Sequence, residues 1–140
     1  YKRQDGFCHV HKSIHSEDVK KAKELHPDAL VLAHPECTSD TLALADFIGS
    51  TSQIIDYATA SDSKKFLICT EMGVFYELMQ KNPDKKFFSV GHRQFCPNMK
   101  KVSLDKVLEK LEDLKDEVIL PEEMCEQAKK PLDEMLRLAQ

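Results

Sequence analysis

The 140-residue sequence contains no apolar run that approaches the roughly 18–20 residues of a membrane-spanning helix. Its first residues do not lead into the apolar core of a secretory signal peptide. Basic residues are scattered along a chain of net charge −4, which argues against a nucleic-acid-binding surface. We therefore expect a cytoplasmic protein that has neither a membrane nor a nucleic acid as a partner.

The chain also lacks solenoid-length repeats, low-complexity linkers and an initiating methionine. The string GFCHVH at Gly6–His11 is typical of the end of a βα unit whose strand is missing, so we expect a fragment. Residues 1–15 would end an upstream α/β domain, residues 16–100 would form an α/β domain, and residues 101–140 would be C-terminal helices.

The cysteines are odd in number and widely spaced, at Cys8, Cys37, Cys69, Cys96 and Cys125. In a chain without a secretion signal, disulfides are a weaker interpretation of such a set than metal binding or reactivity.

Short apolar runs alternate with amphipathic segments along the chain. The apolar runs predict strands at 29–33, 46–49, 65–69 and 86–90. Helices are expected at 16–25, 38–45, 53–58, 72–81 and 103–114, with Ser16 and Ser103 as N-caps. A final helix would begin at Pro121 and be kinked or interrupted at Pro131. The alternation predicts an α/β fold, a three-layer α/β/α sandwich with a mostly parallel sheet.

The apolar run at 29–33 ends abruptly in His34, Pro35, Glu36 and Cys37. Pro35 cannot donate to a sheet ladder, so the chain must leave the sheet there. An imidazole, a carboxylate and a thiol would then lie at the carboxyl end of a buried strand, where open α/β sheets bind ligands. An ordinary polar turn is the alternative interpretation.

Polar strings also follow the other three predicted strands, at Gly49–Ser52, Cys69–Glu71 and Phe95–Asn98. Because the carboxyl ends of parallel strands share one edge, all four strings are expected on one rim of the sheet. Ser50 and Thr51 offer hydroxyls at a helix N-terminus, where free N–H groups attract anions. Helix capping is the structural alternative, and no Gly-Lys-Ser/Thr follows to make a Walker loop.

Taken in order, the strings GFCHVH, HPEC, ADFIGSTS, the Thr70-Glu71 turn, FCPNMK and the final Pro-Glu-Glu helix resemble quinolinate synthase. The resemblance covers essentially the whole chain and is to the C-terminal part of that enzyme. It implies part of a pseudo-threefold enzyme with three similar α/β/α domains. It also implies condensation of iminoaspartate with dihydroxyacetone phosphate to quinolinate, the precursor of NAD, and a functional link to L-aspartate oxidase.

The resemblance implies a 4Fe–4S cluster that is held by three cysteines and has one open iron acting as a Lewis acid. Two ligand positions match Cys8 and Cys96, which should converge, and the third would lie upstream of this chain. A chain with two of the three ligands is not expected to catalyse the reaction alone. The remaining cysteines are expected to be buried or bystander thiols: Cys37, Cys69 and Cys125.

His34 and Glu36 match the substrate-contacting and acid–base pair of the family, and His11 resembles an active-site histidine. Ser50 and Thr51 match hydroxyls that hold a substrate carboxylate. Imidazole groups titrate near neutral pH, which suits the proton transfers of condensation and dehydration. The resemblance leaves the roles of five nearby residues open: His9, Thr70, Glu71, His92 and Arg93.

Two alternatives remain. A mononuclear zinc hydrolase would use Cys8, His9, His11 and His34. If the CHVH string is extended, however, His9 faces away from Cys8 and His11. The second alternative is a non-catalytic α/β binding module without a metal.

Overall fold

The computed structural model describes residues 6–91, 94–115 and 117–139. Residues from Gly6 to Met99 form one compact unit, and the chain from Lys100 onward belongs to a second. A short 3₁₀ helix, η1 (Met99–Lys101), lies at the division. The predicted assignment of residues 1–15 to an upstream domain stays a prediction.

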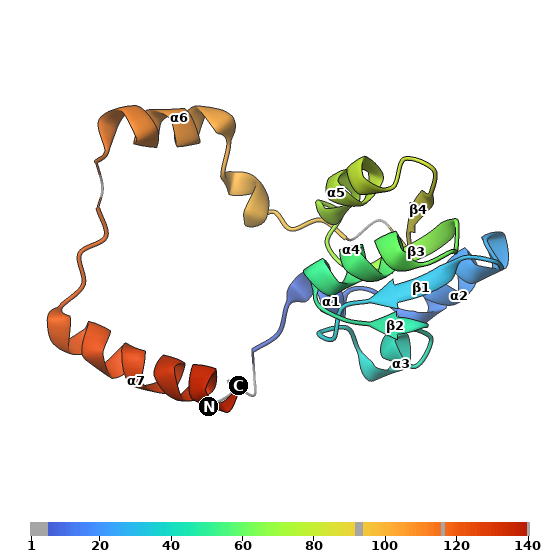
Figure 1. The fold of residues 1–140 in the computed structure, drawn as a ribbon, viewed down its shortest axis with the longest axis horizontal. Coiled ribbons are helices and arrows are strands. Elements are labelled where there is room, and N and C mark those ends of the chain that lie inside the picture. Colours follow the sequence, from blue (N-terminus) through green and yellow to red (C-terminus); the bar gives the residue numbers. More distant parts are fainter. Residues whose placement is uncertain (1–5, 92–93, 116, 140) are drawn as a thin grey trace. The chain divides into compact units, whose positions relative to one another are not determined.

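A four-stranded parallel sheet forms the centre of the Gly6–Met99 unit (Figure 1). Its strands, in the spatial order β2-β1-β3-β4, are β1 (Leu30–Ala33), β2 (Phe47–Ile48), β3 (Lys65–Cys69) and β4 (Lys86–Ser89). Every pair of neighbouring strands is parallel. The predicted α/β fold with a mostly parallel sheet is confirmed.

The two central strands send alternate side chains into two separate cores. Val31 of β1 and Leu67 of β3 pack on one face of the sheet. Leu32, Phe66 and Ile68 pack on the other face, and each is fully buried. A strand that is apolar on both faces is stable only where both faces are covered, which explains the near-continuous apolar runs.

Helices cover each face of the sheet (Figure 1). On one face lie α4 (Thr51–Ala60) and α5 (Val74–Lys81), which contribute Ile54 and Leu78 to the core. On the other face lie α2 (Ser16–Leu25) and α3 (Ser39–Leu42), which contribute Val19 and the half-buried Leu42. The predicted three-layer α/β/α arrangement is therefore confirmed.

The helix bounds differ from the prediction by up to three residues, since α3 ends at Leu42 and α5 begins at Val74. The N-cap of α2 and the start of α4 also differ, for local reasons. His15, with extended backbone, is the N-cap of α2, so Ser16 is the first helical residue and not the cap. Helix α4 starts at Thr51, two residues earlier than expected, because Ser50 and Gln53 form a capping box.

The second half of the GFCHVH string is helical, whereas the zinc alternative was weighed for an extended string. Helix α1 spans His9–Lys12 with Cys8 as its N-cap, and the Lys12 N–H donates to the Cys8 carbonyl oxygen at 3.0 Å. Residues three apart in a helix lie on the same side, so the side chains of Cys8 and His11 lie on one side of α1. The exposed His9 points elsewhere. The condition of an extended CHVH string is therefore not met.

The second unit holds α6 (Leu104–Asp113) and α7 (Glu122–Leu138). Ser103 caps α6 as predicted, its Oγ accepting from the Lys106 N–H at 3.5 Å. Helix α7 continues through Pro131, so the predicted interruption is wrong, and the kink offered as its alternative stays a prediction. Proline removes one N–H donor from the ladder, and the hydrogen bonds on either side hold the helix together.

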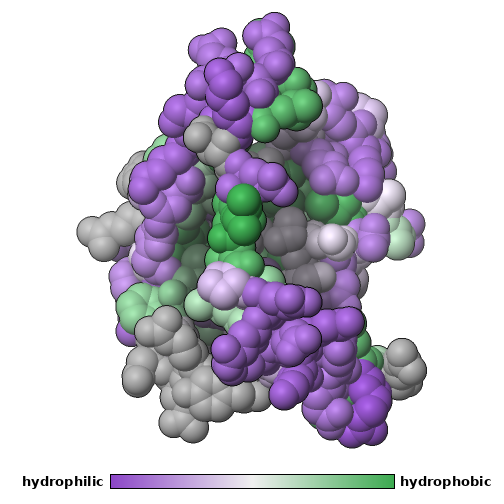
Figure 2. Space-filling model, turned by 90° about the vertical axis from the view of Figure 1, so that its left-hand side faces the viewer, coloured by the Kyte–Doolittle hydropathy of each residue, from purple (hydrophilic) through white to green (hydrophobic). Residues whose placement is uncertain are grey.

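Every described residue from 100 to 139 is exposed. Figure 2 shows apolar side chains open at the surface among hydrophilic ones. The apolar stripe of α6 has the predicted spacing, yet Leu104 is 88% exposed and Leu111 is 69% exposed. Among the described helices, none has the length and apolar character needed to cross a membrane.

Candidate functional site at the carboxyl edge of the sheet

The polar strings after the four parallel strands lie at one edge of the sheet, as the topology requires. The Gly6–Met99 unit contains a cavity of about 410 Å³ there, and its lining includes Cys8, His11, Thr51, Thr70, Glu71 and Cys96. These residues come from α1, the start of α4, the end of β3 and the loop after β4. Tertiary structure thus gathers side chains from nearly the whole length of the unit.

His11, which is only 7% exposed, connects the loop after β1 with the end of β3 through its two ring nitrogens. Nδ1 lies 2.9 Å from Glu36 Oε2, and Nε2 lies 2.9 Å from Thr70 Oγ1. An ionised carboxylate only accepts hydrogen bonds, so Nδ1 of a neutral His11 donates to Glu36 and Nε2 accepts from the Thr70 hydroxyl. The result is a continuous chain of hydrogen bonds, Glu36–His11–Thr70.

His34 stacks on His11 with ring centroids 4.1 Å apart and planes within 5° of parallel. Its Nδ1 accepts the backbone N–H of Glu36 at 3.2 Å, so the neutral ring carries its proton on Nε2. Burial lowers the pKa of His34, and the neighbouring His11 lowers it further, while the Glu36 carboxylate opposes both. His34 is therefore a neutral N–H donor near pH 7.

The turn after β1 positions both His34 and Glu36. The His34 N–H still belongs to the sheet, donating to the Cys69 carbonyl oxygen at 3.2 Å. The chain then turns at Pro35, and the Cys37 N–H donates back to the His34 carbonyl oxygen at 3.0 Å. The predicted exit from the sheet at Pro35 is what brings the Glu36 carboxylate toward His11.

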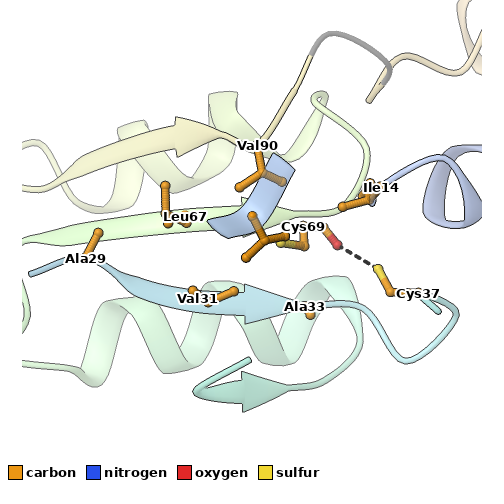
Figure 3. Close-up of a cluster of buried hydrophobic side chains, with 9 residues drawn as sticks. Ile14, Ala29, Val31, Ala33, Cys37, Leu67, Cys69 and Val90 are labelled. Carbon is orange, nitrogen blue, oxygen red and sulfur yellow. Dashed lines mark hydrogen bonds between the residues drawn. The ribbon is translucent and has the colours of Figure 1, made fainter. Parts of the chain in front are cut away.

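The five cysteines, all free thiols, fall into different environments. Figure 3 shows Cys37 and Cys69 within the apolar core, with Cys37 Sγ donating to the Cys69 carbonyl oxygen at 3.4 Å. Burial raises the pKa of Cys37 to about 11 and raises the pKa of Cys69 further still. Cys8 and Cys96 are half-buried and line the cavity. Only these two lie where a thiolate is accessible from the site.

Glu71 anchors the loop that carries Cys96. One carboxylate oxygen accepts the Cys96 backbone N–H at 3.2 Å, and the other accepts the Gly73 N–H at 2.6 Å. The end of β3 and the turn before α5 are thereby tied to the thiol-bearing loop. Glu71, left without an assigned role by the sequence, has this positioning contact.

Gln94 is a residue that sequence reasoning missed. It is 3% exposed, and its side-chain amide donates to the carbonyl oxygens of Ile68 and Thr70, each at 2.6 Å. Its side-chain oxygen accepts the Val90 N–H at 2.8 Å, so Gln94 joins the carboxyl ends of β3 and β4. A glutamine in a polar loop carries no signal of burial, and only its position between a strand and Cys96 could have drawn attention to it.

Ser50 and Thr51 differ in their surroundings. The Ser50 hydroxyl accepts the Gln53 N–H at 3.4 Å, and the Gln53 side-chain oxygen accepts the Ser50 N–H at 2.8 Å. Ser50 therefore has the capping role that the sequence left as an alternative. Thr51 is exposed and lines the cavity, at the N-terminus of a ten-residue helix. The predicted carboxylate contacts of both residues stay predictions.

One group of metal-ligating side chains stands out among the described residues. Ligand atoms of Cys8, His11 and Glu36 all lie within 4.8 Å of one another. The zinc set suggested by the sequence differs, because it included His9 and His34 and omitted Glu36. His92 and Arg93 lie outside the described residues.

These observations define a class. The Gly6–Met99 unit is a parallel α/β/α protein with a site at the carboxyl edge of its sheet, and that site combines stacked histidines, a carboxylate and two accessible thiols.

Comparison with known proteins identifies the family within this class. Residues 2–137 match the family model described as "NadA: Quinolinate synthetase A protein". The chain is 52% identical to the quinolinate synthase of Caldicellulosiruptor bescii over 134 residues, 96% of this chain and 44% of that protein. It is 46% identical to quinolinate synthase 2 of Methanosarcina acetivorans, over 96% of this chain and 43% of that protein. The chain belongs to the quinolinate synthetase A family, and it spans less than half the length of these relatives.

Proposed function

We propose that the protein is part of a quinolinate synthase, which condenses iminoaspartate with dihydroxyacetone phosphate in NAD biosynthesis. One observation carries the proposal. The cavity is lined by the Cys8 and Cys96 thiols and also by His11 and Thr70, two members of the Glu36–His11–Thr70 hydrogen-bond chain. Membership of the family, whose relatives carry the name quinolinate synthase, supports the choice of reaction. A cytoplasmic location and a functional link to L-aspartate oxidase complete the proposal.

The residues present could supply two of the three cysteine ligands of a 4Fe–4S cluster. Such clusters are held by cysteine thiolates, and Cys8 and Cys96 offer half-buried free thiols on one cavity from opposite ends of the unit. Burial keeps Cys37 and Cys69 protonated, which disfavours them as ligands. The third thiolate would come from the rest of the protein, since this chain covers 44% of its relative. When bound, the cluster would supply an open iron that acts as a Lewis acid.

The histidines and Glu36 would handle the substrate's protons. His34, held neutral by burial, presents an Nε2–H that can donate to a substrate oxygen. The Glu36 side chain is 54% exposed, so its carboxylate can exchange a proton with a substrate while His11 holds it in place. The buried Thr70 hydroxyl bonds to the other ring nitrogen of His11, Nε2, which keeps Nδ1 turned toward Glu36.

The start of α4 would receive a substrate carboxylate. Thr51 offers a hydroxyl at the N-terminus of the helix, where the first-turn N–H groups have no intrahelical acceptor and the helix dipole favours an anion. Ser50 would hold the end of the helix in shape through its capping box.

Anaerobic purification of the intact protein tests the proposal through its iron, its acid-labile sulfide and its quinolinate formation. We expect Cys8→Ser and Cys96→Ser each to lose the cluster and the activity. Cys37→Ser should keep the iron, because that thiol lies in the apolar core. Full iron and sulfide in both Cys8→Ser and Cys96→Ser, or loss of the cluster on Cys37→Ser alone, would show that the wrong thiols were chosen.

A further inference from the structure

Three side chains at the site form a ligand group that differs from the proposed cluster set. Cys8 is the N-cap of α1, His11 lies in its last turn, and Glu36 lies in the loop after β1. Their ligand atoms all lie within 4.8 Å of one another. Cys96 lines the same cavity and does not belong to this group.

The donor set and its spacing suit zinc. Zinc takes thiolate, imidazole and carboxylate ligands at about 2.0–2.3 Å, usually in a tetrahedron. Two ligands at about 2.1 Å from the ion are then about 3.4 Å apart. His11 Nδ1 and Glu36 Oε2 are 2.9 Å apart, so they must separate by only about half an ångström to admit the ion. The half-exposed Glu36 side chain has room to do so.

The outer partner of such a site is already in place. Metal-binding histidines almost always donate their second ring N–H to a fixed acceptor, which sets the tautomer and the ring orientation. With Nδ1 on a metal, His11 would carry its proton on Nε2 and donate it to Thr70 Oγ1, now 2.9 Å away. Both residues are buried, so the ring is held with Nδ1 facing Glu36.

We propose that the protein without its cluster binds one zinc ion through Cys8 Sγ, His11 Nδ1 and the Glu36 carboxylate. On binding the ion, the Cys8 thiol would release its proton, and the charge of the ion would balance the resulting thiolate and the Glu36 carboxylate, whose ligand atoms lie within 4.8 Å of each other. The second part of the inference rests on the proposed function. Because Cys8 would serve both centres, zinc and the cluster exclude each other, and zinc blocks cluster assembly.

The experiment uses the intact protein, stripped of metal by a chelator without oxygen and titrated with Zn²⁺ against a colorimetric competitor. Co²⁺ replaces zinc in a parallel titration, since thiolate ligation of Co²⁺ gives a charge-transfer band. We expect one Zn²⁺ per chain and a thiolate–cobalt band. Cys8→Ser and Glu36→Gln should each weaken zinc binding at least about tenfold, and Thr70→Val should weaken it by about tenfold.

Two cysteine variants serve as controls. Cys96→Ser should retain zinc while losing the cluster, and the exposed Cys125→Ser should retain both. Loss of zinc in Cys96→Ser, or its retention in Cys8→Ser, would overturn the proposed ligand set. Glu36→Gln should still take up iron and sulfide, and zinc added first should block that uptake in the unchanged protein but far less in this variant.

The same measurements separate the two proposals. A protein that binds zinc with the expected variant pattern but takes up no iron and sulfide supports the zinc site and refutes the cluster. A protein that assembles the cluster but binds zinc no better than Glu36→Gln refutes the zinc site alone.

Discussion

Phe66 in β3 is fully buried, whereas Leu111 in α6 is 69% exposed, although both belong to regular apolar patterns. In the Gly6–Met99 unit, the parallel sheet offers two flat apolar faces, and helices close over both. In the second unit, α6 and α7 have apolar stripes, and none of their described residues is buried. An amphipathic pattern shows that a helix has an apolar face to bury, but it does not show which surface buries that face.

The cysteines repeat this contrast. Cys37 and Cys69 share the core of the sheet unit, and burial changes their acid–base chemistry. Cys125 in α7 is exposed. The chemical character of each thiol therefore follows from the packing around it. Substitutions matched between the two units measure how large this difference is.

The largest effect should come from the sheet core. Phe66→Ala removes a fully buried ring and should lower the free energy of unfolding by about 3–5 kcal/mol. Leu111→Ala, its match in α6, should change it by less than about 0.5 kcal/mol. Urea unfolding of the chain, followed by circular dichroism, measures both. An equal cost for Leu111→Ala would mean that α6 packs on a partner surface.

A buried polar network should come next. Gln94→Ala leaves the carbonyl groups of Ile68 and Thr70 and the Val90 N–H without their partner, which should cost about 2–4 kcal/mol. Gln127→Ala removes an exposed contact to Glu123 in α7 and should cost less than about 0.5 kcal/mol. Thermal melts of the two variants compare them directly. Similar melting temperatures would contradict the role given to Gln94.

The buried thiol Cys37 should make stability depend on alkaline pH. Its pKa is about 11 in the folded chain against an ordinary value of 9.0, so the unfolded chain loses its proton first. Stability should therefore be fully present below pH 9 and fall by up to about 2–3 kcal/mol as the pH rises through 11. Cys69 contributes in the same direction.

Urea titrations from pH 8 to 11 measure this dependence, with Cys37→Ala and the exposed Cys125→Ala as the matched pair. Cys37→Ala should make the fall in stability shallower and leave the contribution of Cys69, and Cys125→Ala should leave the curve unchanged. Equal curves for all three proteins would show that burial does not control the Cys37 thiol.

The smallest effect should come from the helix caps. Ser50→Ala should cost about 1 kcal/mol of stability, because α4 is packed on the sheet and loses its capping box. Ser103→Ala removes the cap of the exposed α6 and should cost only a few tenths of a kcal/mol in the same melt.

The double variant Ser50→Ala, Thr51→Ala separates capping from ligand binding. If Thr51 and the helix start hold a carboxylate, the affinity of the intact protein for malate should fall by about 1.5–3 kcal/mol for each lost hydrogen bond to the charged group. Calorimetric titration measures this loss. Lower stability with unchanged malate affinity would leave both residues as parts of the helix end only.

Much of the fold could be predicted from local sequence. The four apolar runs gave the strands to within two residues, because a doubly buried strand is continuously apolar. Helix α1 was not predicted, since four residues are too few to show a helical period. Pro131 misled for the opposite reason, because a long helix tolerates one missing donor that a local rule counts as a break.

The sequence by itself determined the parallel sheet, the rim that carries His34 and Glu36, and the family to which the chain belongs. Those features follow from local periodicity and from short strings of neighbouring residues. Only the tertiary structure decided that His11 lies between Glu36 and Thr70, that Gln94 is buried, and that Cys37 is sealed in the core. These properties depend on residues far apart in the sequence, such as His11 with Glu36, 25 positions away, and with Thr70, 59 positions away. Packing alone brings such residues together, and packing also determines which thiols and imidazoles are exposed to solvent.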